Sequence, residues 1–193
     1  MTGVTREHGF KATIEMDIRA LGSGPKGALF LMAAILAMNK FSAVLLFRMS
    51  ASLYTGGAIS RFCSSAIHRL NMIVNSCEIS PAAQIGPGLY LPHPIGIVVG
   101  PCRAGVGLTI MQNVTIGLRT VNADQMDYEN YPNFGSNVRV GPGAAILGGV
   151  SIGDKAILGA NAVVLDSVPA SAIMVGNPAR VARIIGRITN API

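Results

Sequence analysis

Apolar residues recur at every sixth position through the second half of the chain. This period matches neither the 3.6-residue repeat of an amphipathic helix nor the two-residue alternation of an ordinary strand. The recurring positions are Ile79, Ile85, Leu91 and Ile97, then, after a slip of one residue, Ala104, Ile110 and Ile116, and, beyond an interruption, Val140, Ile146, Ile152, Leu158 and Val164. Twelve positions in three blocks indicate a repeat architecture.

A six-residue unit supplies one short strand and one tight turn, and three units close a triangular coil of about 18 residues. The branched aliphatic residue then points inward and stacks on its counterparts in neighbouring coils. Small residues let the backbone turn at the corners. Glycine follows the apolar position repeatedly, at Gly86, Gly105, Gly117, Gly141, Gly153 and Gly159. The pattern predicts a mainly β fold, a solenoid of parallel strands.

The first 76 residues follow a different pattern, which predicts a disordered start and then helices. Residues 27–47 form the most apolar stretch, and it has the length of about 20 residues that a bilayer span needs. Lys40 near its middle disfavours insertion. Buried helices used for subunit packing, a helix lying on a membrane surface and a true span all remain open.

Two further helices are predicted over residues 41–54 and 58–74. The second has one apolar face, made of Ile59, Phe62, Ala66, Ile67, Leu70 and Val74. The chain therefore divides into a helical region, 1–76, and a solenoid, 77–187, followed by a tail, 188–193. Residues 118–137 interrupt the repeat and form an inserted loop.

Composition narrows the functional classes. The net charge is +6, but the basic residues are scattered singly, which does not favour nucleic-acid binding. A phosphate-rich cofactor or an anionic lipid surface fits this charge better.

The three cysteines, Cys63, Cys77 and Cys102, form no CxxC pair and have no nearby histidine at metal spacing, so no metal is expected. They fit a reducing compartment, and with no apparent signal peptide the prediction is a cytoplasmic protein that could associate peripherally with the inner membrane.

Three segments carry a family resemblance: EISPAAQIGPGLYLPHPIGIVVG at 78–100, TIMQNVTIG at 109–117 and VGNPARVARI at 175–184. They resemble the hexapeptide-repeat acyltransferases, closest to the serine acetyltransferase branch and, within it, to exopolysaccharide-associated O-acetyltransferases. The resemblance covers residues 78–183. It implies a left-handed β-helix, acetyl-CoA as co-substrate and a homotrimer, with stacking of two trimers through the helices left open.

The resemblance also implies the catalytic base. Acetyl transfer to an alcohol needs a group that removes the hydroxyl proton, and histidine suits neutral pH. His93 is the one histidine of the predicted solenoid and lies between Pro92 and Pro94. The family places a carboxylate fifteen positions before this histidine, which here is Glu78. A structural corner histidine and a solvated carboxylate are the alternative interpretations.

Coenzyme A is expected along the later coils. By position match the residues are Gly117, Gly141, Pro142, Gly159, Ala160 and Arg180. Arg180 is the candidate for a CoA phosphate, because a guanidinium forks onto phosphate oxygens. The glycines also have an architectural explanation. The inserted loop is expected to wall the acceptor pocket or act as a lid, with an ordinary surface loop as the alternative.

Two departures bear on the acceptor. Pro92 replaces the aspartate before the family's catalytic histidine, and an Arg-His pair that helps hold serine maps onto Asn130 and Tyr131. Losing these charges weakens complementarity to a zwitterion. The prediction is therefore an O-acetyltransferase acting on a sugar hydroxyl in polysaccharide biosynthesis. Serine O-acetyltransferase and a non-catalytic trimeric scaffold are the alternatives.

Overall fold

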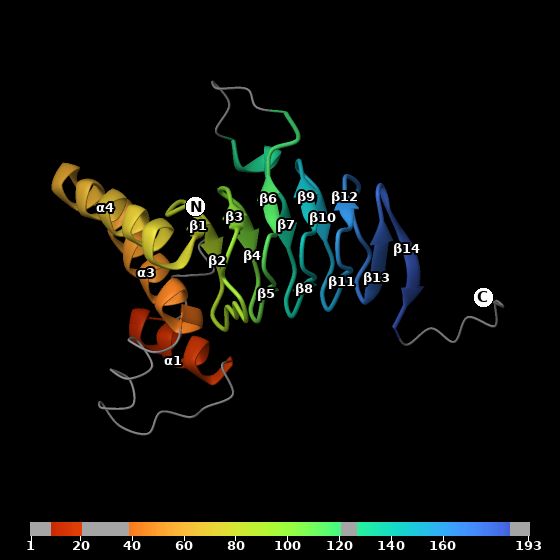
Figure 1. Ribbon diagram of the computed structural model, residues 1–193, viewed down its shortest axis with the longest axis horizontal. Helices are drawn as coiled ribbons and strands as arrows, with labels where there is room; N and C mark the ends of the chain where they lie inside the picture. The colour runs from red at the N-terminus through yellow and green to blue at the C-terminus, as the bar shows by residue number, and fades with distance from the viewer. Residues whose placement is uncertain (1–8, 21–38, 121–126, 186–193) are drawn as a thin grey trace.

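The computed structural model describes residues 9–20, 39–120 and 127–185. A group of helices lies at one end of a long β-solenoid, and the strands follow one another along the solenoid toward the C-terminus (Figure 1). The two parts meet where α4 ends at Asn75 and β1 begins at Cys77.

Three sheets form the sides of the solenoid. Sheet I contains β1 (Cys77–Ile79), β3 (Ile97–Val99), β6 (Thr115–Gly117), β9 (Ala145–Leu147) and β12 (Val163–Val164). Sheet II contains β2 (Gln84–Ile85), β4 (Arg103–Ala104), β7 (Asn133–Phe134) and β10 (Ser151–Ile152). Sheet III contains β5 (Thr109–Ile110), β8 (Arg139–Val140), β11 (Ile157–Leu158), β13 (Ala172–Gly176) and β14 (Ala179–Ile184). The chain visits the sheets in the order I, II, III.

The hydrophobic repeat predicted the interior of this solenoid correctly. All twelve recurring positions are buried, and each is at most 3% exposed. Neighbouring coils pair in parallel, so that Ile116 lies between Val99 and Ile146 in sheet I. Among the strands that the structure describes, only the last pair, β13 with β14, is antiparallel, and it lies at the C-terminal end of the solenoid. The parallel β-helix is confirmed.

The slip of one residue in the repeat has two separate origins. In sheet I the stacked inward residue is Val99, which pairs with Ile79 and Ile116, although Ile97 is buried as well. Val99 comes eight positions after Leu91, whereas Ile116 comes six after Ile110. The corner between Leu91 and Val99 is thus two residues longer than its counterpart. The next corner, to Ala104, is one residue shorter than the one from Ile79 to Ile85.

The insertion ends earlier than the sequence pattern indicated. The chain rejoins sheet II at β7, where Phe134 pairs with Ala104 and is 3% exposed. Phe134 was not counted because an aromatic side chain departs from the aliphatic repeat. Residues 133–137 therefore belong to the solenoid, and the excursion lies between Gly117 and Asn133.

Helices α3 (Asn39–Tyr54) and α4 (Ala58–Asn75) agree with the two predicted helices and pack against each other. A further helix, α1 (Phe10–Ala20), occupies a segment predicted to be disordered, so that prediction was wrong there. Residues 27–38 of the apolar stretch lie outside the described residues. Within the part that the structure describes, no helix is long and apolar enough to cross a membrane.

A buried ion pair joins the helices to the first coil. Arg48 of α3 contacts Asp17 of α1, with 2.9 Å between Nε and Oδ2, and the two side chains are 5% and 1% exposed. Arg48 also donates to the carbonyl oxygens of Ile85 and Gly86. Asp17 in turn accepts from the backbone N–H groups of Gly88 and Leu89. These long-range partners explain why the sequence of α1 did not predict its order.

Candidate active site

His93 lies on the extended corner between sheet III and sheet I. Its imidazole is exposed, while the flanking Pro94 is buried and Pro92 is half-buried. The proline rings restrict the backbone on both sides of the histidine. The two extra residues of this corner are what carry His93 outward from the regular repeat. The corner therefore presents the imidazole at the surface on a restricted backbone.

Glu78 lies on the neighbouring coil next to this corner. It is half-buried on β1 and pairs with Val98, five residues after His93. The N–H of Gly96 donates to the carbonyl oxygen of Ser76 over 2.8 Å, which ties the His93 corner to the start of β1. In the described part of the chain no hydrogen bond joins Glu78 to His93. The structure brings the two residues to one region without linking them directly.

The corners that stack below His93 form what we call the His93 edge, residues 92–96, 111–114, 141–144 and 159–162. Backbone hydrogen bonds of 2.9–3.0 Å connect successive corners, from Asn113 to Ile95, Gly143 to Gln112 and Asn161 to Pro142. The edge carries four of the predicted CoA residues: Gly141, Pro142, Gly159 and Ala160. They therefore share one side of the solenoid with His93.

The glycines of this edge also have a packing role. A Cβ at Gly141 would lie 2.8 Å from the carbonyl oxygen of Leu158, and one at Gly159 would lie 3.0 Å from that of Met174. The coils approach too closely here for a side chain. This architectural requirement explains both glycines whether or not a ligand binds.

The other two predicted CoA residues, Gly117 and Arg180, do not lie on the His93 edge. The corners between sheet I and sheet II form what we call the insertion edge, residues 80–83, 100–102, 118–120, 127–132, 148–150 and 165–167. Gly117 ends β6 at this edge. Arg180 is 70% exposed on β14 and contacts Asp166 over 3.6 Å, itself 77% exposed. An ion pair this exposed contributes little to stability. Within one chain, these two residues are not beside His93.

The end of the insertion packs back onto the insertion edge. The 3₁₀ turn η1 (Tyr128–Asn130) is held by the Tyr128 hydroxyl, which donates to the carbonyl of Ala82, and the guanidinium of Arg103 lies 4.9 Å from the ring centre. Burial is the main cause that raises the pKa of Tyr128. This segment is therefore docked on the first two coils.

The two predicted acceptor residues have different surroundings. Asn130 is exposed, whereas Tyr131 is buried, with its ring against Gly100. A Cβ at Gly100 would lie 2.7 Å from Cε1 of Tyr131, so glycine is needed there. Both residues lie on the insertion edge, across sheet I from the His93 edge. One chain alone does not bring them to the imidazole.

Two further features of the His93 region were not anticipated. Ile95, just before β3, and Val98, within β3, are exposed apolar side chains. Gln112, on the next corner of the His93 edge, has its Oε1 buried without a hydrogen-bond partner among the described residues. A buried, unsatisfied carbonyl oxygen needs an explanation, and a bound donor is one.

Other chemistry is disfavoured at this end of the solenoid. Burial raises the pKa of Cys77 and of Cys102 to about 12, so neither thiol ionises near neutral pH. Among the described residues, no three His, Cys, Asp or Glu side chains gather as metal ligands do.

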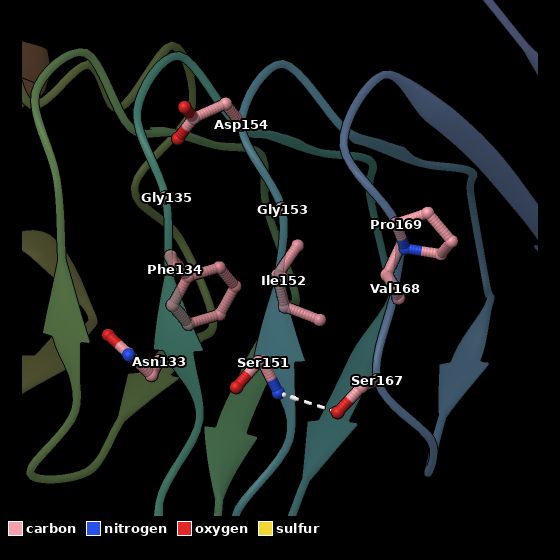
Figure 2. Close-up of a pocket in the computed structure, with 10 residues that line it drawn as sticks. All are labelled: Asn133, Phe134, Gly135, Ser151, Ile152, Gly153, Asp154, Ser167, Val168 and Pro169. Carbon is pink, nitrogen blue, oxygen red and sulfur yellow. Dashed lines mark hydrogen bonds between the residues drawn. The ribbon is translucent and has the colours of Figure 1, made fainter.

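A depression of about 620 Å³ lies elsewhere, on sheet II and its corners (Figure 2). Its polar groups largely connect coils: the N–H of Ser151 donates to Oγ of Ser167, and Asp154 accepts from the N–H of Ser136. Sheet II is the side opposite the His93 edge. The depression contains none of the predicted site residues.

The fold and this edge define a class, the hexapeptide-repeat β-helix proteins with a surface histidine. Residues 132–166 match the family model of the bacterial transferase hexapeptide (six repeats). The serine acetyltransferase of Helicobacter pylori is 36% identical over 120 residues, which cover 62% of this chain and 68% of that protein. The chain belongs to the bacterial hexapeptide transferase family, and its named relatives are serine acetyltransferases.

A further curated relative and two solved structures that are similar to the chain are also serine acetyltransferases. The Staphylococcus xylosus serine acetyltransferase is 37% identical over 122 residues, 63% of this chain and 55% of that protein. The crystal structure of the Neisseria gonorrhoeae enzyme is similar with a TM-score of 0.78 and 29% identity, covering 92% of this chain and 67% of that one. A solved serine acetyltransferase in complex with CoA has a TM-score of 0.75, with 29% identity over 90% of this chain and 69% of that one. The chain thus spans between about half and two thirds of these relatives.

Proposed function

We propose that this protein is an acetyl-CoA-dependent O-acetyltransferase with His93 as its general base. The observation that carries the proposal is the extended corner, which presents an exposed imidazole above the stacked corners of the His93 edge. A corner histidine with only a structural role would need no such extension. The serine acetyltransferase relatives, one of them solved with CoA, supply the class of reaction.

The reaction follows from what an imidazole can do beside a thioester. His93 accepts the hydroxyl proton as the acceptor oxygen attacks the acetyl carbonyl carbon. The tetrahedral intermediate then collapses, the C–S bond breaks, and the imidazolium returns the proton to the CoA sulfur. In this proposal Glu78, which lies near the His93 corner without a direct hydrogen bond to it, would orient the ring and stabilise the imidazolium, as a carboxylate does in related catalytic arrangements. Gly141, Pro142, Gly159 and Ala160 would hold CoA through backbone groups.

A complete site in this proposal includes a neighbouring copy of the chain. The predicted residues fall on two edges of sheet I: His93 on one, and Gly117, Asn130 and Tyr131 on the other. In a homotrimer, the His93 edge of one copy would face the insertion edge of the next. The exposed apolar residues Ile95 and Val98 fit such a seam. The left-handed winding and the trimer both remain predictions from the family resemblance.

The comparisons favour L-serine as the acceptor, because the relatives that they identify are serine acetyltransferases. A sugar hydroxyl, the acceptor predicted from the sequence, is favoured by the site residues themselves. Pro92 and Tyr131 carry no charge, and Tyr131 is buried against Gly100. The narrower likeness to exopolysaccharide-associated enzymes stays a prediction.

A thiol-release assay with acetyl-CoA separates these functions. It is run with L-serine, with a panel of free and nucleotide-linked sugars, and with no acceptor. Turnover with serine at ordinary enzymatic rates identifies a serine O-acetyltransferase, and turnover with sugars alone identifies the sugar enzyme. Absence of turnover and of CoA binding in calorimetry would favour the trimeric scaffold and overturn the proposal.

A further inference from the structure

Helix α4 turns its apolar side away from the protein. Ile59 is 82% exposed, Phe62 75% and Ile73 80%. With Leu70 and Val74, also exposed, they form what we call the α4 stripe: Ile59, Phe62, Leu70, Ile73 and Val74. At 100° per residue these five positions fall within about 120° of one another, on one side of the helix. Exposed apolar residues gathered in this way mark an interaction surface.

The opposite side of α4 is polar and buried. Oγ of Ser64 donates to the carbonyl of Ser50 over 2.7 Å, and Nδ2 of Asn71 donates to the carbonyl of Ala43 over 3.0 Å. Asn75 accepts from the Ser42 hydroxyl over 2.7 Å. Turning the stripe toward α3 would break these bonds and leave buried polar groups unsatisfied. The outward position of the stripe is therefore fixed by the polar contacts.

The charge around the stripe has one sign. Between Ile18 and Cys77 the sequence contains no Asp or Glu. The basic residues of this stretch are Arg19, Lys26, Lys40, Arg48, Arg61 and Arg69. Arg61 and Arg69 are exposed on α4. At 100° per residue Arg69 lies beside Phe62 at the border of the stripe, and Arg61 lies about 80° further round, toward the polar side. An apolar helix face bordered by arginine is typical of helices that lie in a membrane interface.

We propose that the α4 stripe docks on an anionic phospholipid surface. A second copy of the chain fits less well, because it would bring a second helical region of the same positive charge against the stripe. Neither α3 nor α4 contains an acidic residue that could pair with the arginines of the other copy. An anionic bilayer offers both an apolar phase and the opposite charge. Figure 1 shows α4 at the helical end of the molecule, clear of the strands that follow along the solenoid.

Co-sedimentation with vesicles tests the proposal. The protein is expected to bind vesicles that contain phosphatidylglycerol, and to bind phosphatidylcholine vesicles weakly. Each arginine near an anionic surface contributes roughly a five-fold gain in partitioning. Arg69→Gln should therefore weaken binding about five-fold and reduce its dependence on salt, and Arg61→Gln, further from the stripe, should weaken it less.

The apolar contribution is tested by Phe62→Ser with Ile73→Ser, which should abolish vesicle binding. The matched control is Val181→Ser with Ile185→Ser, two similarly apolar residues that are 47% and 45% exposed near the C-terminal end. The control should bind as the unmodified protein does. Acetyl transfer to a small free acceptor should be unchanged in both variants, so failure here is distinguishable from failure of the proposed function.

A fluorescent label on Cys63 tests the contact of α4 with lipid without any substitution in the helix. Cys63 is exposed on α4, whereas Cys77 and Cys102 are buried, so a polarity-sensitive fluorophore should react selectively with Cys63. Its emission should shift to the blue on anionic vesicles and stay unchanged on neutral ones. No shift on either vesicle would overturn the proposal. A lower oligomeric mass for the stripe variant in light scattering, without vesicle binding by the unmodified protein, would assign the stripe to a second copy instead.

Discussion

The solenoid and helix α4 use apolar residues in opposite ways. In the solenoid the repeating aliphatic side chain points inward, and Ile110 is fully buried. On α4 the apolar side chains point outward, and Ser64, Asn71 and Asn75 are buried instead. A hydrophobic pattern thus predicts the element and its apolar face. Which way that face turns depends on the partners available to the rest of the element.

The largest expected effect concerns His93, the histidine that the solenoid exposes on its surface. His93→Ala should lower kcat about 100-fold or more, because general base catalysis contributes roughly 10²–10⁴. The steady-state rate of thiol release measures this, with the acceptor that the thiol-release assay identifies. His68→Ala on α4 is the matched histidine control and should retain near-full activity. A His93→Ala variant as active as the unmodified protein would remove the imidazole from the mechanism.

The second prediction concerns the buried Asp17–Arg48 contacts that connect the helices to the first coil of the solenoid. Asp17→Ala leaves the buried Arg48 guanidinium unpaired and removes the acceptor of the Gly88 and Leu89 N–H groups. Removing one partner of a buried pair costs about 3–5 kcal/mol. Unfolding in urea should show this loss of free energy. Glu15→Ala, an exposed acid on the same helix, is the control and should change little.

The sequence predicted the repeating interior well because each inward position obeys a local period. The extended His93 corner was not visible, since Ile97 is also apolar and buried and therefore kept the period while Val99 took the stacked position. Helix α1 was missed because its order depends on Asp17 and partners more than thirty residues away. The outward rotation of α4 depends on polar bonds to α3, which the hydrophobic pattern does not contain.

The third prediction compares the two regions directly by the same substitution. Ile110→Ala in the solenoid should cost about 2–5 kcal/mol, because it removes a fully buried side chain and leaves a cavity. Ile73→Ala on α4, where the side chain is 80% exposed, should change the free energy of unfolding by about 0.5 kcal/mol or less. Urea unfolding without lipid measures both. Equal losses would mean that the stripe is covered within the folded protein.

The smallest effect concerns the two buried thiols at the start of the solenoid. The pKa of Cys77 and of Cys102 is raised from 9.0 to about 12, so the folded state keeps both protons above pH 9 while the unfolded chain releases them. Stability from these groups is complete below pH 9 and is lost as the pH rises toward 12. At pH 10 the loss should be about 1 kcal/mol per thiol.

Urea unfolding at pH 8 and pH 10 measures that loss, and Cys77→Ala with Cys102→Ala should reduce its pH dependence. Cys63→Ala is the control, because Cys63 is exposed on α4 and should leave the pH dependence unchanged. If the double variant loses as much stability between the two pH values as the unmodified protein, the thiols are accessible to solvent in the folded state. The first coils would then be less tightly closed by α1 and α3 than the Asp17–Arg48 contacts indicate.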